Sequence, residues 1–216
     1  MPRKRGSFQK KTKKSANRPD KNRVQHSKEN APRIEEVEIL FEKCENRFEE
    51  ILIALSGLAG MRESEIAHCR KDWINWQDKV ISIPKSLKCS CGECTRERDG
   101  WWYPKTEVGS RNIYMLKELR PYVEDYFGYE NGINCSRQTV YNTIKSIAKR
   151  TNIKKEIHPH SLRSSFASRL GDMGVSTTTM MNQLGWKLIE TANRYCRTDD
   201  KLSIKQVKAL DGDLDE

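Results

Sequence analysis

The 216-residue chain has no run that approaches the about 18 consecutive apolar residues needed to cross a membrane. No apolar stretch follows its basic N-terminus, so the sequence also lacks the pattern of a secretory signal. Hydrophobic residues make up only 36% of the chain and charged residues 32%, which predicts a modest core beneath a highly charged surface. We therefore expect an intracellular, cytoplasmic protein without membrane partners, built as one sizeable domain with tails.

Acidic residues are scarce at the start of the chain. Residues 1–33 contain twelve Lys and Arg but only Asp20 and Glu29, so this segment accounts for the whole net charge of +10. Because it also has almost no aromatic or branched side chains, we predict a disordered basic arm over residues 1–33. The arm is interpreted either as a solubilising or nuclear-type targeting tail, or as a segment that neutralises nucleic-acid phosphates.

After the arm, most of the sequence has helical periodicity. Apolar residues at helical spacing predict one or two amphipathic helices over 34–58. Further helices are expected over residues 63–70, 117–128, 137–151, 160–172, 177–184 and 188–197. Three strand-like runs, 73–76, 79–83 and 111–116, predict a small sheet. The expected class is α+β and mostly α, with helices around a small three-stranded antiparallel sheet, in a domain spanning 34–198 that precedes a C-terminal tail, 199–216.

Charge is unevenly distributed within this domain. Residues 34–60 contain seven Glu, whereas residues 136–170 contain eight Lys and Arg against the single acid Glu156. The basic segment is interpreted as a candidate face for a polyanion, and the alternative is an ordinary solvated helix face.

Four short motifs occur in a characteristic order. Gly60–Glu65 reads Gly-Met-Arg-Glu-Ser-Glu, His160–Arg163 reads His-Ser-Leu-Arg, and Leu184–Trp186 reads Leu-Gly-Trp, with Tyr195 nine residues after the tryptophan. In sequence and spacing, these motifs closely resemble the catalytic domain of the tyrosine recombinase, or phage-type integrase, family. The resemblance covers about residues 34–198 and implies that family's catalytic fold.

The resemblance implies a role for each residue at a DNA phosphodiester. Arg62 and Arg163 would bind the non-bridging oxygens and offset the charge that grows in the transition state. Tyr195 would attack phosphorus and form a 3′-phosphotyrosine. The family also carries a lysine in a β-hairpin between the motifs as general acid, for which Lys105 is the best candidate. The alternatives in the same hairpin, which carries an insertion over residues 84–104, are Lys85 and Lys88.

Three further residues complete the expected catalytic set. His160 would assist proton transfer from Tyr195 or bind a phosphate oxygen. Trp186, which has only an N–H donor, would bind a non-bridging oxygen. Glu65, one helical turn from Arg62, would orient the Arg62 guanidinium, and no step requires a metal. Taken singly, each of these residues has a structural alternative, such as packing in the core for the two aromatic side chains.

The resemblance implies a site-specific DNA recombinase, the integrase of a virus, plasmid or other mobile element, that cuts and rejoins double-stranded DNA. By analogy, four copies would assemble in a synapse on DNA, and Leu202–Leu210 resembles the family's tail that docks onto a neighbouring copy. An alternative packing of that tail is on its own domain. Other interpretations are a topoisomerase or resolvase with the same residues, and a non-catalytic DNA-binding protein.

The chain contains seven cysteines, and an intracellular setting argues against disulfides. Cys89, Cys91 and Cys94 place three thiols within six residues, a spacing typical of a metal site. A closed tetrahedral Zn²⁺ site needs a fourth ligand, for which His68 and Cys69 are candidates. The alternative is a surface loop with reduced thiols. A structural zinc would stiffen the insertion that leads to Lys105.

Overall fold

The computed structural model describes residues 29–196 together with Ile204 and Lys208. Most of the predicted arm and most of the tail therefore lie outside the described residues. Of the tail's apolar side chains, Ile204 is described and is exposed. Within the described part of the chain, no helix combines the length and apolarity that a membrane crossing requires.

The described elements are nine α-helices, two 3₁₀ turns and five short strands. The helices are α2 (Ile34–Glu42), α3 (Arg47–Gly57), α4 (Glu63–Ala67), α5 (Gly92–Glu97), α6 (Arg120–Tyr129), α7 (Arg137–Lys149), α8 (Pro159–Asp172), α9 (Thr177–Leu184) and α10 (Ile189–Asn193). The strands are β1 (Ile74–Asn75), β2 (Val80–Ile83), β3 (Leu87–Lys88), β4 (Trp101–Trp102) and β5 (Arg111–Tyr114), and the 3₁₀ turns are η1 (Lys71–Trp73) and η2 (Glu107–Gly109).

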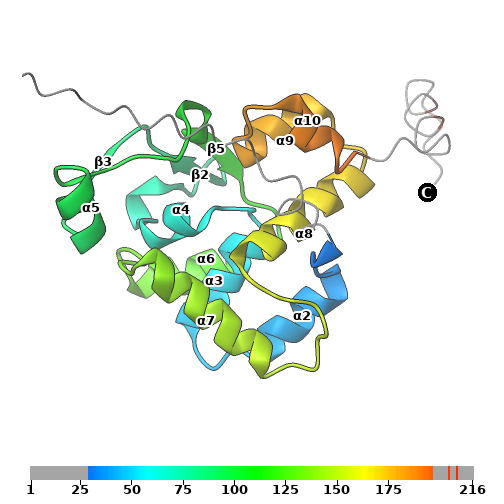
Figure 1. Cartoon of the computed structure of the whole chain (residues 1–216), viewed down its shortest axis with the longest axis horizontal. Helices are drawn as coiled ribbons and strands as arrows, with labels where there is room; N and C mark the ends of the chain where they lie inside the picture. Colours follow the sequence, from blue (N-terminus) through cyan, green and yellow to red (C-terminus); the bar gives the residue numbers. More distant parts are fainter. Residues whose placement is uncertain (1–28, 197–203, 205–207, 209–216) are drawn as a thin grey trace, which may run out of the picture.

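The three predicted strands form the sheet that the sequence indicates. Strands β1, β2 and β5 pair antiparallel in the order β1-β2-β5, with Ile81 opposite both Ile74 and Ile113. Strands β3 and β4 form a separate antiparallel pair, which with α5 makes up the insertion and projects at one side of the molecule (Figure 1). The prediction of helices around a small three-stranded sheet is thus confirmed.

Helix α3 lies at the centre of the main core. Its start is fixed by Asn46, whose side-chain oxygen accepts a hydrogen bond from the Glu49 N–H at 3.0 Å. The five residues from Ile51 to Leu55 are completely buried because α3 packs against α8, α6 and α7. Helix α8 crosses the molecule between α3 and the α9–α10 pair (Figure 1).

A second, smaller core joins α8 to the C-terminal helices. Phe166, Leu184 and Tyr195 are buried in it. Ser176 caps α9 by accepting a hydrogen bond from the Thr179 N–H, and Gly185 ends the helix in the left-handed region with φ of 61°. These two signals position the Leu184–Trp186 motif at the end of α9.

Some predicted boundaries change in the structure. The helix expected over 63–70 ends at Ala67, because Lys71–Trp73 forms a 3₁₀ turn and Arg70 makes a bridge to Gly132. The folded part begins by Asn30, a few residues before the predicted boundary at residue 33. The Oδ1 atom of Asn30 accepts a hydrogen bond from the Glu156 N–H, and the Ser165 hydroxyl donates to the carbonyl of Pro32.

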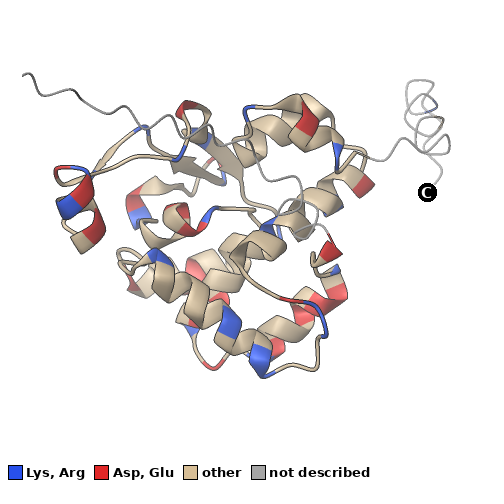
Figure 2. Cartoon of the chain, in the orientation of Figure 1, with Lys and Arg blue, Asp and Glu red and all other residues tan. Residues whose placement is uncertain are grey.

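The basic segment 136–170 is largely neutralised within the fold. Figure 2 shows basic bands on α7 and on the loop that follows it, near acidic bands on α2. Five of its eight cations form ion pairs, namely Arg137 with Glu93, Lys145 with Glu156, Arg150 with Glu45 and Glu49, Lys155 with Glu36, and Arg169 with Glu118. These five cations are therefore paired rather than free, and three of their six carboxylate partners, Glu36, Glu45 and Glu49, come from the acidic segment 34–60.

Candidate active site

Arg62 is held at the start of α4, where it occupies the cap position. Its backbone N–H donates to Glu65 Oε2 at 2.8 Å, and its Nη1 donates to Oε1 at 2.8 Å. Its Nη2 donates to the carbonyl of Gly185 at 2.6 Å. The guanidinium is thus fixed between α4 and the end of α9, and it remains partly exposed.

Glu65 is completely buried between two arginines. Besides Arg62, it receives hydrogen bonds from Arg111 Nη1 at 2.9 Å and Arg111 Nη2 at 3.0 Å, in a two-pronged contact. Burial alone would raise the pKa of Glu65, but Arg111 and Arg62 outweigh burial and lower it to about 2. Glu65 therefore takes the orienting position that the sequence predicts, and it orients both arginines.

Arg111 belongs to the site although no sequence motif indicates it. It begins strand β5, 46 residues from Glu65, and its Nε also donates to the carbonyl of Gln183 at 2.8 Å. The chain carries only a general signal for such a residue, because a buried glutamate needs a cation. This requirement does not identify which of the many arginines in the chain compensates the charge of Glu65.

Arg163 lies on the buried side of α8, 3% exposed. Its two terminal nitrogens donate to the carbonyls of Gly60 and Leu184. Burial, and then the neighbouring charge of Arg62, lower the pKa of Arg163 well below its usual value. The guanidinium therefore sits between the two loops that carry the Gly60–Glu65 and Leu184–Trp186 motifs, in a place where an anion would relieve an unfavourable charge.

His160 is at the first turn of α8, which is capped by His158. Its side chain reaches the surface but is crowded, and this crowding, then the charge of Arg163, lower the pKa of His160 to about 4. His160 is therefore neutral at pH 7, but a pKa this low makes it a weak base as long as no anion is bound. Lys105 lies exposed on the loop between β4 and η2, and its charge is among those that act on His160, which places it on the same side of the molecule.

Tyr195 is buried beside Arg163, 5% exposed. Its hydroxyl donates to Ser164 Oγ at 3.1 Å, and its ring stacks on Trp186 with centroids 5.3 Å apart. The same Trp186 ring lies 5.9 Å from the centre of the Arg163 guanidinium. The structure thus brings Arg163, Trp186 and Tyr195 into one cluster, in which the phenol is bonded to protein.

The assembled cluster has an excess of positive charge. Among the described residues, Arg62, Arg111 and Arg163 all act on the single carboxylate of Glu65, while His160 is neutral. The partly exposed position of Arg62 gives a ligand access to this charge. Such a site fits an anion with at least two oxygens, as a phosphate group has.

The three predicted metal ligands lie in the insertion. There they form a second cluster, which is separate from the arginine cluster. Cys89, Cys91 and Cys94 lie with His68, and their ligand atoms are all within 4.8 Å of one another. Of the two fourth ligands left open by the sequence, the structure brings in His68. Cys69 is completely buried and is not part of this group.

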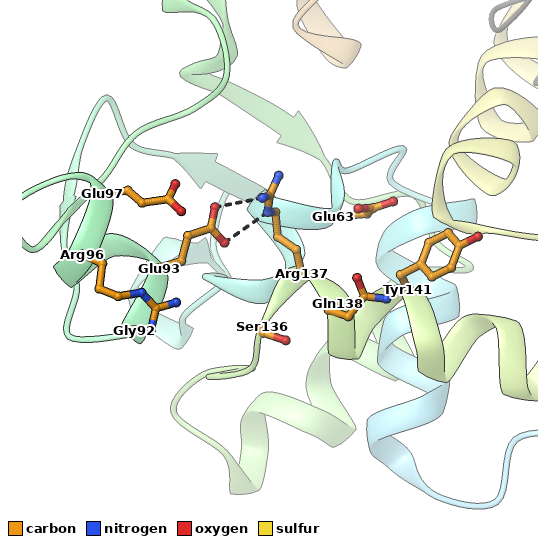
Figure 3. Close-up of a pocket in the computed structure, with 9 residues that line it drawn as sticks. All are labelled: Glu63, Gly92, Glu93, Arg96, Glu97, Ser136, Arg137, Gln138 and Tyr141. Carbon is orange, nitrogen blue, oxygen red and sulfur yellow. Dashed lines mark hydrogen bonds and ion pairs between the residues drawn. The ribbon is translucent and has the colours of Figure 1, made fainter.

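A pocket of about 620 Å³ lies between α5 and the start of α7 (Figure 3). Across it, the carboxylate of Glu93 faces the guanidinium of Arg137 at 3.0 Å. Its lining includes Glu63 but none of the predicted catalytic residues. The pocket therefore separates the insertion from α7 and is distinct from the arginine cluster.

Most of the chain is similar in sequence to known proteins. The chain matches the phage integrase family over residues 33–201. It is 30% identical over 163 residues to a tyrosine recombinase of Thermosipho africanus, an alignment that covers 73% of this chain and 52% of that protein. It is 25% identical over 172 residues to the tyrosine recombinase XerC of Staphylococcus saprophyticus, covering 74% and 54%. The chain spans about half the length of these curated relatives.

Solved structures show the same fold. The XerA recombinase superposes with a TM-score of 0.59 and 17% identity, covering 81% of this chain and 62% of that one. The Tn1549 transposon integrase in complex with transposon right end DNA superposes with a TM-score of 0.57 and 19% identity, covering 82% of this chain and 64% of that one. The XerH recombinase bound to difH substrate superposes with a TM-score of 0.56 and 15% identity, covering 82% of this chain and 53% of that one. With a family match over most of its length and the catalytic fold of these recombinases, the chain belongs to the phage integrase family.

Proposed function

We propose that this chain is the catalytic part of a site-specific DNA recombinase of a virus or other mobile element. The observation that carries the proposal is the arginine cluster, in which the buried Glu65 holds Arg62, two backbone carbonyls hold Arg163, and Tyr195 lies beside Arg163. An anion-binding pair beside a phenol fits phosphoryl transfer, because the charge that grows on the phosphate is offset where the nucleophile attacks.

In the binding step, the scissile phosphate of double-stranded DNA enters beside Arg62 and Arg163. The charge of the phosphate offsets the unfavourable burial of the Arg163 cation. Glu65 and Arg111 contact no DNA in this scheme. They hold the Arg62 guanidinium in place so that little reorganisation is needed when the phosphate arrives.

In the chemical step, the Tyr195 oxygen forms a bond to phosphorus while the bond from phosphorus to the 5′-oxygen breaks. The phenol proton passes to His160, whose lowered pKa rises when the negative charge of the phosphate offsets the arginines beside it, and Lys105 gives a proton to the departing 5′-oxygen. Trp186 donates its N–H to a non-bridging oxygen. The resulting 3′-phosphotyrosine keeps the bond energy, and attack by a second 5′-hydroxyl reverses the step on another strand.

The test is capture of the covalent intermediate. The full chain is incubated with a pool of nicked duplexes of randomised sequence, in which the fragment released by cleavage diffuses away, and adducts are separated on a denaturing gel. We expect an adduct with the native chain and with Tyr129→Phe, a matched change at an exposed tyrosine, and none with Tyr195→Phe. DNA binding without any adduct would instead support the non-catalytic DNA-binding protein.

The proposed partners are DNA and further copies of the chain. The support for DNA is that the XerH and Tn1549 structures are complexes with DNA. We expect four copies in the active synapse, and the assembly acts on intracellular DNA. Analytical ultracentrifugation on an adduct-forming duplex tests this, with a single copy per duplex in all conditions as the contrary result.

A further inference from the structure

We propose that His68, Cys89, Cys91 and Cys94 bind one structural Zn²⁺ ion that fastens the β3–α5–β4 insertion to helix α4. These residues come from two places, the end of α4 and the insertion that follows β3, and their ligand atoms all lie within 4.8 Å of one another. The metal site therefore joins two segments that no disulfide connects, since all the cysteines of the described residues are free.

The distances fit a tetrahedral zinc centre. His68 Nε2 lies 3.5 Å from Cys91 Sγ and 3.4 Å from Cys94 Sγ. Zinc bonds of about 2.3 Å to sulfur and about 2.0 Å to nitrogen at a tetrahedral angle place the two ligand atoms about 3.5 Å apart. The site is therefore already close to the size that the ion requires.

The histidine is oriented as a metal ligand. Its Nδ1–H donates to the carbonyl of Ser64 at 2.8 Å, which leaves the lone pair of Nε2 directed at the sulfur atoms. Metal-binding histidines commonly use their second nitrogen in this way, because the hydrogen bond fixes both tautomer and ring orientation. The ring also stacks on the buried Trp102, with centroids 5.3 Å apart, so it has little freedom to turn away.

The backbone of the insertion is folded around the sulfur atoms. The N–H of Cys91 donates to Cys89 Sγ, and the N–H of Cys94 donates to Cys91 Sγ, each at 3.4 Å. Two backbone bonds close the loop, from Cys89 N to Gly100 O at 2.8 Å and from Gly100 N to Cys94 O at 3.0 Å. N–H groups directed at sulfur stabilise thiolates, which are the form that binds metal.

The chemistry of the ligands selects zinc and a structural role. Three thiolates and one imidazole are a soft set of four that suits Zn²⁺. A four-ligand set leaves no open position for water, so the ion would not act on substrate. The three thiolates leave one net negative charge on the occupied site. Of the charges that act on His68, Arg70 and Arg98 can offset it, whereas Glu93 adds to it but is paired with Arg137.

The location gives the ion a consequence for the active site, and this part rests on the proposed function. His68 caps the end of α4, whose first cap residue is Arg62, and β4 leads within a few residues to Lys105. Zinc would therefore restrain the segment that carries the general acid relative to the helix that presents an arginine to the phosphate.

Native mass spectrometry of the full chain, purified without chelator, tests the site directly. We expect one zinc per chain, and after removal and replacement by Co²⁺ we expect the visible absorption of a tetrahedral, thiolate-bound cobalt ion. Cys94→Ser and His68→Gln should weaken zinc binding by more than the about 100-fold that loss of an outer hydrogen-bond partner costs. The matched control Cys135→Ser, at a half-buried cysteine outside the cluster, should bind zinc normally.

A chain that carries no zinc and shows no thiolate-bound cobalt spectrum overturns the proposal, and this result needs no variant to fold. Hydrogen exchange provides a second readout, since chelation should raise exchange over residues 84–104 more than over α3. Equal exchange with and without the ion would refute the fastening role. Because none of these measurements uses DNA cleavage, their failure is distinguishable from failure of the proposed function.

Discussion

Replacing Glu65 with glutamine tests the central electrostatic feature of the site. The carboxylate accepts four hydrogen bonds, two from Arg111 and two from Arg62, and is completely buried. Glutamine keeps the shape but has no charge, and its NH₂ group must face an N–H donor. Removal of one partner from a buried ion pair costs about 3–5 kcal/mol, so we expect a loss of that size in the free energy of unfolding at pH 7.

The pH dependence of stability gives an independent value for the contribution of Glu65 to the free energy of unfolding. The pKa of Glu65 falls from 4.5 to about 2 on folding, and each pKa unit corresponds to about 1.36 kcal/mol, so ionisation contributes about 3 kcal/mol. Because the folded-state pKa is the lower one, this contribution is complete above pH 4.5 and is lost as the pH falls towards 2. By pH 3, about 2 kcal/mol of it should be gone.

The assay is urea unfolding of the native chain and Glu65→Gln at several pH values between 6 and 3. The difference in the free energy of unfolding between the native chain and Glu65→Gln should decrease by about 2 kcal/mol from pH 6 to pH 3. Glu118→Gln is the control, since Glu118 pairs with Arg169 at the surface with half of its side chain exposed, and it should cost below about 1 kcal/mol. A difference for Glu65→Gln that does not change with pH would refute the reasoning.

Three further predictions concern the rest of the site. A Cβ at Gly171 would lie 1.9 Å from the backbone oxygen of Tyr195, so Gly171→Ala should abolish adduct formation and lower the melting temperature, whereas Gly128→Ala, with nothing within 4 Å, should do neither. NMR titration of His160 should give a pKa near 4, and a value at or above 6.5 would show that its crowding has little effect. Deletion of residues 1–28 should weaken DNA binding and flatten its dependence on salt, and an unchanged slope would exclude a phosphate-neutralising arm.

The sequence predicts the helical part of the fold well where local signals are strong. Helix α9 has the predicted limits because Ser176 caps its start and Gly185 provides the left-handed stop. The sheet is also predicted, because three of the four residues of β2 are β-branched. The elements of the insertion were not predicted, since β3 and β4 have two residues each and α5 has six, too short for periodicity to be seen.

The contacts within the site depend on tertiary structure. The motifs identify Arg62, Glu65 and Arg163 from the chain alone, but the contact of Arg111 with Glu65 joins positions 46 residues apart and has no local pattern. The same is true of the ion pairs that neutralise the basic segment, such as Lys155 with Glu36. Nor does a motif reveal that the Tyr195 hydroxyl is bonded to Ser164.

The hydrogen bond between Tyr195 and Ser164 has a consequence for the order of DNA binding and DNA cleavage. The Tyr195 phenol is buried, stacks on Trp186 and donates a hydrogen bond to Ser164, whereas Arg62 is partly exposed. The hydrogen bond to Ser164 has to break before the phenol oxygen attacks phosphorus. Under the proposed chemistry, a lone copy can thus dock on a duplex and leave again with both strands whole. Strand cleavage then requires a change that releases the Tyr195 side chain, and this change is the step at which cleavage can be regulated.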